Sequence, residues 1–155
     1  MKLHEILKEE YIRVNLASKS KDDLIKQMIK IIENSPYVLD IKKVEQAVFD
    51  RELSVSTGIG NGLAFPHGKT DGVTDNIISF AITEKPVDYD SQDEIPVRLV
   101  FFLVGRDPNH HLKLISRISR IIRDEDNRAK LLQATSASEV FNIIKTAEEN
   151  LPTIL

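Results

Sequence analysis

One histidine stands in a setting that would present its ring in a fixed direction. His67 lies between Pro66 and Gly68, within a stretch, residues 54–72, that holds five of the chain's six glycines. Proline fixes its own φ, while glycine leaves the following backbone free to turn. A free histidine has a pKa of about 6.5, so an unprotonated ring nitrogen is available as a nucleophile at neutral pH. A loop histidine that only hydrogen-bonds locally is the alternative; the glycine-rich setting favours the functional interpretation.

Three further side chains could support chemistry at that nitrogen. His110 and His111 follow residues 108–109, Pro-Asn, at the expected start of an amphipathic helix. The positive end of the helix dipole favours a phosphate there and disfavours imidazolium. Arg51 ends a helix just before the glycine-rich stretch, and its guanidinium could pair with a phosphoryl oxygen. Each of the three is also explained as an ordinary residue at a helix end.

Composition and motif spacing exclude several other kinds of site. The chain has no cysteine, which excludes disulfides, Cys-ligated zinc and thiol catalysis. Residues 58–62, Gly-Ile-Gly-Asn-Gly, match neither G-x-G-x-x-G nor a Walker loop, so we see no nucleotide site. The histidines lack the H-x-x-x-H spacing of a zinc pair, and we expect neither a metal nor a cofactor.

The charge and hydropathy of the chain bear on its partners and location. A formal net charge of −3 gives no broad attraction to nucleic acid or to an anionic membrane. No apolar run approaches the ~20 residues needed to cross a bilayer. We therefore expect a cytoplasmic protein that binds no nucleic acid and does not insert into the membrane.

The elements that would position the candidate residues follow from hydrophobic periodicity. Residues 97–104 are too apolar to face water on either side over most of their length, which predicts a central strand covered by helices on both faces. Neither a linker nor an internal repeat is visible, so we expect one domain over residues 1–155, with His4 at its surface. The expected order is a short helix at 3–7, a strand at 11–16, helices at 21–33 and 41–52, an irregular loop at 54–72, strands at 77–82 and 97–104, and three helices, of which the first follows residue 109, the second covers 127–133 and the third starts at 136.

Two blocks of this sequence resemble a known family. Residues 51–52, Arg-Glu, and residues 56–68, Ser-Thr-Gly-Ile-Gly-Asn-Gly-Leu-Ala-Phe-Pro-His-Gly, closely resemble the signature of fructose/mannitol-type (type 2) enzyme IIA domains of the bacterial phosphotransferase system, a family that includes a nitrogen-regulatory branch. Residues 102–105 and 111–115 resemble its second block. The resemblance spans essentially the whole chain. It implies an α/β fold, a three-layer α/β/α sandwich with a small mixed sheet flanked by helices, in agreement with the periodicity.

The resemblance also implies roles for the candidate residues. His67 would be the phosphorylated residue and His111 the second active-site histidine, with His110 as the fallback because the two are adjacent. Arg51, 16 positions before His67 (67 − 51), would be the active-site arginine. Support for the phosphate is expected from two residues of the glycine-rich stretch, Thr57 and Gly68.

The implied activity is that of a phosphoryl carrier. It would accept a phosphoryl group from phospho-HPr on His67 and pass it to an enzyme IIB, without metal or nucleotide. Docking would use a shallow apolar patch with a polar rim. Candidates for that patch, each of which would also suit the core, are Ile59, Leu63 and Phe65.

Three alternatives remain open at this point. The chain could be a nitrogen-regulatory IIA that signals by phosphorylation-dependent binding of regulatory protein targets. It could be a histidine-dependent enzyme such as a hydrolase, although a convincing nucleophile, base and orienting group are missing. It could also be a non-catalytic interaction module of the same fold, in which His67 is structural. The sequence indicates neither a sugar nor an oligomeric state.

Overall fold

A long antiparallel pair of strands forms the middle of the sheet. In the computed structural model, which describes residues 2–152, β5 (Ile77–Val87) pairs with β6 (Val97–Gly105) along most of its length. Successive side chains of a strand point to opposite faces. In β6 both sets are buried, which confirms the predicted central strand: Leu99, Phe101 and Leu103 enter one hydrophobic core, and Val100, Phe102 and Val104 enter the other.

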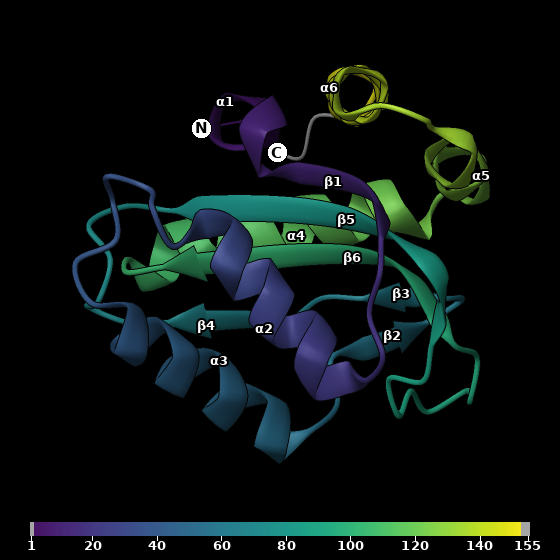
Figure 1. Cartoon of the computed structure of the whole chain (residues 1–155). Coiled ribbons are helices and arrows are strands. Elements are labelled where there is room, and N and C mark those ends of the chain that lie inside the picture. The colour runs from purple at the N-terminus through teal and green to yellow at the C-terminus, as the bar shows by residue number, and fades with distance from the viewer. Residues whose placement is uncertain (1, 153–155) are drawn as a thin grey trace.

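The other strands complete a mixed six-stranded sheet. Its order is β1-β5-β6-β3-β2, and β4 also pairs with β6. β1 runs parallel to β5, β3 and β4 run parallel to β6, and β2 runs antiparallel to β3. The four shorter strands are β1 (Ile12–Leu16), β2 (Gly58–Gly60), β3 (Leu63–Ala64) and β4 (His67–Lys69) (Figure 1).

The glycine-rich stretch is therefore not the irregular loop that we expected. Glycine is costly in strands, which favoured a loop. The edge of β6, however, is buried and its backbone groups need partners. β3 and β4 supply them in turn, with Leu63 opposite Leu99 and His67 opposite Leu103. This pairing fixes the backbone of His67 to the centre of the sheet.

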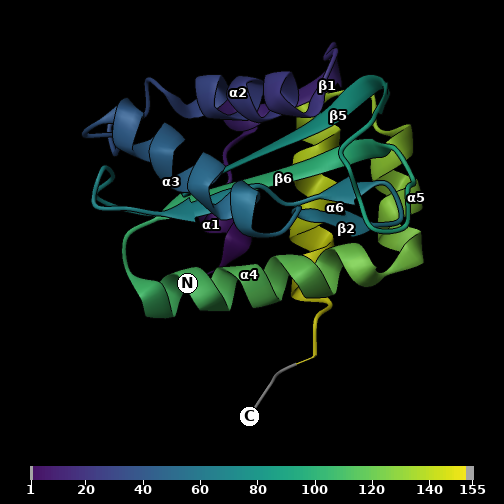
Figure 2. The same cartoon turned by 90° about the horizontal axis from the view of Figure 1, so that it is seen from below.

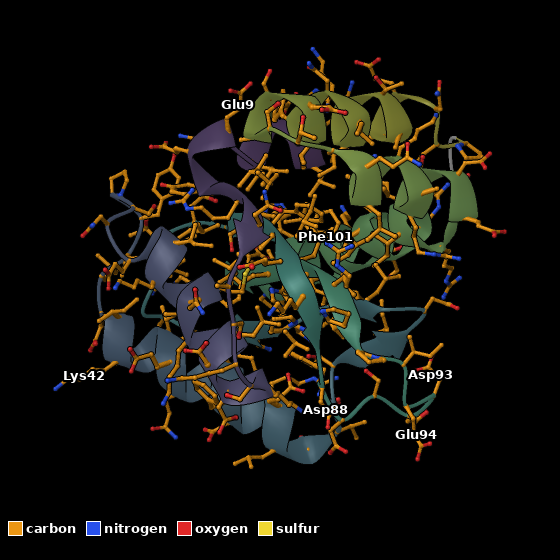
Figure 3. All side chains as sticks on the ribbon, turned by 45° about the vertical axis from the view of Figure 1, so that its right-hand side comes forward. Glu9, Lys42, Asp88, Asp93, Glu94 and Phe101 are labelled. Atoms are coloured by element: carbon orange, nitrogen blue, oxygen red, sulfur yellow. The ribbon has the colours of Figure 1, made fainter. Side chains whose placement is uncertain are left out.

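Helices cover both faces of the sheet, which confirms the three-layer α/β/α arrangement. α2 (Lys21–Ile32) and α3 (Ile41–Ser54) lie on one side, and α4 (Pro108–Arg123) lies on the other (Figures 1 and 2). Figure 3 shows Phe101 between the layers and Lys42 pointing outward. The remaining helices, which pack into the same core as α4, are α1 (Leu3–Ile6), α5 (Glu125–Gln133) and α6 (Ala137–Glu149), and a 3-10 turn, η1 (Glu9–Tyr11), precedes β1. Within residues 2–152, no helix combines the length and apolar composition that a membrane span requires.

Side-chain caps fix where the helices begin. The hydroxyl of Ser20 accepts a hydrogen bond from the Asp23 N–H at 3.1 Å, as expected for the start of α2. The carboxylate of Asp107 accepts from the N–H groups of Asn109 and His110 at 2.8 and 3.3 Å. That cap sets the first turn of α4, which carries both neighbouring histidines.

His4, which we expected at the surface, is only partly exposed. Its side chain is 15% exposed, and its Nδ1 lies 2.5 Å from Glu148 Oε1. The Glu148 carboxylate also accepts from the N–H groups of Leu3 and His4 at 2.6 and 3.0 Å, and Arg117 Nη1 lies 3.5 Å from it. Glu148 therefore ties α1 to α6 and α4. Of the single domain expected over 1–155, residues 1 and 153–155 lie outside the described residues.

Candidate active site

His67 begins β4, and its ring is held by the backbone two residues earlier. Nδ1 lies 2.8 Å from the Phe65 carbonyl oxygen, and the two rings pack with centroids 5.2 Å apart. A carbonyl oxygen only accepts hydrogen bonds, so Nδ1 must carry the hydrogen in the neutral ring. The lone pair then resides on Nε2. Nε2 is therefore the ring nitrogen of His67 that could act as a nucleophile.

The surroundings of His67 keep that nitrogen unprotonated near neutral pH. Burial lowers the pKa of His67 below its ordinary value of about 6.5, because the charged form loses hydration. The bond to the Phe65 carbonyl opposes this change, the Arg51 charge adds to it, and the Glu52 charge opposes it. The net effect is a lowered pKa, which suits a nucleophile.

His111 lies beside His67, and His110 does not. The rings of His67 and His111 have centroids 5.8 Å apart at an angle of 47°. His110 instead is exposed, with Nδ1 3.9 Å from Asp107 Oδ2. Neighbours on an α-helix point about 100° apart, since a turn takes about 3.6 residues. Only one of the two can therefore face into the sheet, and it is His111.

His111 is itself buried and neutral. It is 8% exposed, and its Nδ1 is buried and makes no hydrogen bond within residues 2–152. Burial first, and then the nearby charges of His67 and Lys69, lower the pKa of His111 to about 4. Because Nδ1 is enclosed, Nε2 is the nitrogen that can face a ligand. Gly105 makes room for this ring, since a Cβ built there would lie 3.3 Å from His111 Nδ1.

Arg51 lies in the last turn of α3, on the other side of the site. Its Nη1 donates to the Val55 carbonyl at 2.9 Å, which holds the guanidinium at the end of the helix. Its charge acts on the pKa of His67, so it lies within electrostatic reach of that ring. Its positive charge thus lies on the side of α3 that faces the candidate site, as we expected of an arginine at this helix end.

Thr57 lies inside a buried polar cluster. Its hydroxyl oxygen is 2.5 Å from Glu52 Oε1 and 2.9 Å from the Tyr89 hydroxyl, and its N–H donates to Glu52 Oε2 at 2.6 Å. Lys21 Nζ completes the cluster at 3.0 Å from Glu52 Oε2. From the sequence, Glu52 was noted only as part of a motif, and Lys21 and Tyr89 were missed. A buried carboxylate needs such partners, but no sequence pattern indicates which residues they would be.

Gly68 packs against α3, where a Cβ would lie 3.0 Å from Val48 N. A side chain at this position would press β4 away from the helix. Glycine here thus brings β4 and the neighbouring His67 close to α3.

The expectation that Ile59, Leu63 and Phe65 form an exposed apolar patch is wrong for two of the three residues. Leu63 and Phe65 are buried in the core, and only Ile59 of the three is exposed, at 50%. Exposed apolar side chains do occur within four positions after Arg51 and directly after His111 in the chain. They are Leu53, Val55 and Leu112.

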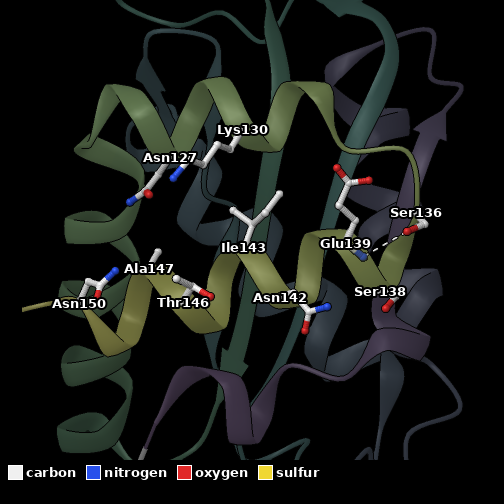
Figure 4. A pocket seen from close by; sticks show the side chains of 10 residues that line it. All are labelled: Asn127, Lys130, Ser136, Ser138, Glu139, Asn142, Ile143, Thr146, Ala147 and Asn150. Atoms are coloured by element: carbon white, nitrogen blue, oxygen red, sulfur yellow. Dashed lines mark hydrogen bonds between the residues drawn. The ribbon is translucent and has the colours of Figure 1, made fainter.

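Two other features of the described residues lie outside the candidate site: the possible metal ligands and a groove beside the C-terminal helices. Among residues 2–152, no group of three or more histidine, aspartate or glutamate side chains is placed to hold a metal ion. A groove of about 540 Å³ lies along α5 and α6, away from the candidate residues (Figure 4). Its lining is mostly polar and comprises Asn127, Lys130, Ser136, Ser138, Glu139, Asn142, Ile143, Thr146, Ala147 and Asn150.

The sequence matches one described family over nearly its whole length. Residues 5–147 match the family model for "Phosphoenolpyruvate-dependent sugar phosphotransferase system, EIIA 2". The mannitol-specific phosphotransferase enzyme IIA component of Staphylococcus aureus is 34% identical over 148 residues, which are 94% of this chain and 99% of that protein. The fructose-specific EIIABC component of Bacillus subtilis is 36% identical over 146 residues. That match covers 93% of this chain but only 23% of the relative.

Solved structures show the same fold. The nitrogen regulatory protein IIA-Ntr from Neisseria meningitidis superposes with a TM-score of 0.83 and 32% identity, covering 92% of this chain and 98% of that one. The IIA mannitol protein from Escherichia coli, in its complex with phosphorylated IIB mannitol, gives a TM-score of 0.78 and 25% identity. The match covers 90% of this chain and 99% of that one.

Proposed function

The chain belongs to the EIIA 2 family of the phosphoenolpyruvate-dependent sugar phosphotransferase system, and we propose that it carries phosphoryl groups on Nε2 of His67. One observation carries the choice of atom. The Phe65 carbonyl holds the hydrogen on Nδ1, so the other nitrogen has the free lone pair. The His111 ring next to it and the lowered pKa of His67 support the same choice.

The transfer step moves the phosphoryl group between two nitrogens. Nε2 of His67 attacks the phosphorus of a phosphohistidine on the donor, for which we propose HPr. The donor N–P bond breaks, and its electron pair returns to the donor ring. The new N–P bond leaves His67 with a positive ring, whose Nδ1–H still donates to the Phe65 carbonyl. No proton needs to be removed, so no separate general base is required.

Neighbouring groups can stabilise the charge on the phosphoryl oxygens during transfer. We assign this role to the Arg51 guanidinium and to an N–H on Nε2 of His111. Gly68, whose backbone belongs to the ladder between β4 and β6, supports the site by allowing β4 to lie close to α3. Thr57 was expected to touch the phosphate; because its hydroxyl is held by Glu52, we propose that it acts indirectly.

The acceptor that we propose is an enzyme IIB, and the cytoplasm is the expected compartment. The complex of the Escherichia coli IIA with phosphorylated IIB supports this choice of partner. The exposed apolar side chains of Leu53, Val55, Ile59 and Leu112 suit a shallow interface for brief encounters. We also propose that residues 1–155 make up one such IIA domain.

A second candidate function is nitrogen regulation through phosphorylation-dependent binding. The similarity to the Neisseria meningitidis IIA-Ntr favours it. A transfer assay separates the two. The phosphorylated chain is mixed with purified IIB proteins of the fructose and mannitol types. Transfer of the phosphoryl group from the chain to a IIB cysteine supports the transport function. A phosphoryl group that stays on the chain with every IIB supports the regulatory one.

The carrier function itself is tested with phosphoenolpyruvate, enzyme I and HPr. We expect label on the wild-type chain and none on His67→Gln. A His67→Gln protein that accepts stoichiometric phosphate would rule the assignment out.

A further inference from the structure

We infer that Glu52 is a positioning residue for His67 and acts on it through a continuous series of hydrogen bonds. The inference rests on the proposed function of His67, and it adds a residue for which the sequence suggested no role.

The series begins at the Glu52 carboxylate. Both of its oxygens are bound by Thr57, Oε2 by the backbone N–H at 2.6 Å and Oε1 by the hydroxyl at 2.5 Å. The Thr57 carbonyl in turn accepts from the Phe65 N–H at 2.9 Å. The Phe65 carbonyl then accepts from Nδ1 of His67 at 2.8 Å. Four residues from three segments are thus linked from a buried carboxylate to the reacting ring.

Glu52 is fixed firmly enough to serve as the anchor of this series. Its side chain is 6% exposed, and Lys21 Nζ lies 3.0 Å from Oε2. The Tyr89 hydroxyl donates to Oε1 at 3.2 Å, and Lys21 Nζ lies 4.8 Å from the centre of the Tyr89 ring. The partners come from α2, from the residue before β2 and from the segment that follows β5. Breaking a buried charge cluster of this kind is strongly unfavourable, so the carboxylate has little freedom to move.

The anchor determines two properties of His67. The position of the Phe65 carbonyl sets the direction of the ring and keeps the hydrogen on Nδ1, which leaves the lone pair on Nε2. The negative charge of Glu52 also raises the pKa of His67 and so limits the effect of burial. Loss of that charge should loosen the ring, mix its two tautomers and lower its pKa further.

The test compares Glu52→Gln with Glu45→Gln. Both remove one negative charge from α3, but Glu45 is exposed, so it is the matched control. The first readout is ¹⁵N NMR of the His67 ring, which reports its tautomer and its pKa. We expect mainly the Nδ1–H tautomer in wild type and control. In Glu52→Gln we expect a mixture of tautomers and a lower pKa.

The second readout is transfer from phospho-HPr. Misplacement of a reacting group by a fraction of an ångström lowers rates steeply, so we expect the rate at saturating HPr to fall roughly tenfold in Glu52→Gln. The HPr concentration at half-maximal rate should stay within about twofold, because the docking surface is unchanged. A folded Glu52→Gln protein with the wild-type tautomer and rate would overturn the inference.

A second variant covers the case in which Glu52→Gln does not fold. Thr57→Val keeps the shape of the side chain and the N–H bond to Glu52, and removes the hydrogen bonds of the hydroxyl to Glu52 and to Tyr89. We expect the same changes at smaller size, and an unchanged tautomer and rate would count against the inference. If wild type accepts no phosphate, the proposed function fails, whereas the tautomer change still tests the positioning role of Glu52.

Discussion

Replacement of Glu148 by alanine should destabilise the protein more than a substitution at the end of a helix usually does. The Glu148 side chain is 2% exposed, and its carboxylate accepts from the N–H groups of Leu3 and His4 as well as from the His4 ring. An alanine leaves these donors without an acceptor, while Arg117, whose side chain is 37% exposed, can turn to water.

The cost follows from the burial of each donor. A buried donor that loses its partner costs about 1–3 kcal/mol. Leu3 is fully buried, so its N–H is assigned about 2 kcal/mol. His4 is partly exposed, and water can reach it, so its groups are assigned about 1 kcal/mol. The expected loss in the free energy of unfolding is therefore about 3 kcal/mol.

Urea titration followed by circular dichroism measures this loss. Glu149→Ala is the matched control, because Glu149 is the exposed next residue of α6 and the exchange is the same. We expect the control to stay within about 0.5 kcal/mol of wild type, as exposed substitutions usually do. If Glu148→Ala lowers the free energy of unfolding by less than about 1 kcal/mol, the reasoning that this carboxylate holds α1 in place is refuted.

Three further predictions concern His111 and its surroundings. His111→Gln should lower the rate of phosphoryl acceptance by about 100-fold, the usual cost of losing one charge-stabilising donor. His110→Gln should leave that rate within about twofold of wild type, and rapid-quench assays of both variants check this. Gly105→Ala should reduce both stability and the acceptance rate, because its Cβ would lie 2.2 Å from Asn76 Oδ1 and 3.3 Å from His111 Nδ1, and a variant with wild-type values in both assays would show that the contact is relieved without cost. As pH falls from about 6.5 to about 4, the unfolded chain takes up a proton on His111 before the folded chain does, so the free energy of unfolding should fall over this window. Urea unfolding of wild type and His111→Gln at each pH checks this, and the fall should be smaller in the variant.

The parts that the sequence predicted best depend on local patterns. Ser20 was expected to cap a helix and does so through a bond three residues along the chain. The apolar run at 97–104 predicted a central strand, because only burial on both faces explains it. The resemblance favoured His111 over His110, and the structure places the His111 ring beside His67, for which helix geometry gives the physical reason; its role in transfer stays a prediction.

The parts that were missed depend on contacts between distant segments. The Tyr89 hydroxyl and the Glu52 carboxylate are 37 positions apart, and His4 and Glu148 are 144 apart. No periodicity within one helix or strand indicates such pairs, and both carboxylates look like ordinary surface residues in the sequence. The short strands around residues 58–69 were missed for a related reason. Their glycines disfavour a strand locally, and the edge of β6 that pairs with them lies far along the chain.

The most direct test of the account is to identify the phosphorylated nitrogen. The chain is labelled with ¹⁵N at histidine, phosphorylated through enzyme I and HPr, and studied by NMR correlation of phosphorus with the ring nitrogens. We expect one phosphorus coupled to Nε2 of His67, with a hydrogen still on Nδ1. A phosphorus on Nδ1 of His67, or on His111, would contradict the role that the Phe65 carbonyl has in this account.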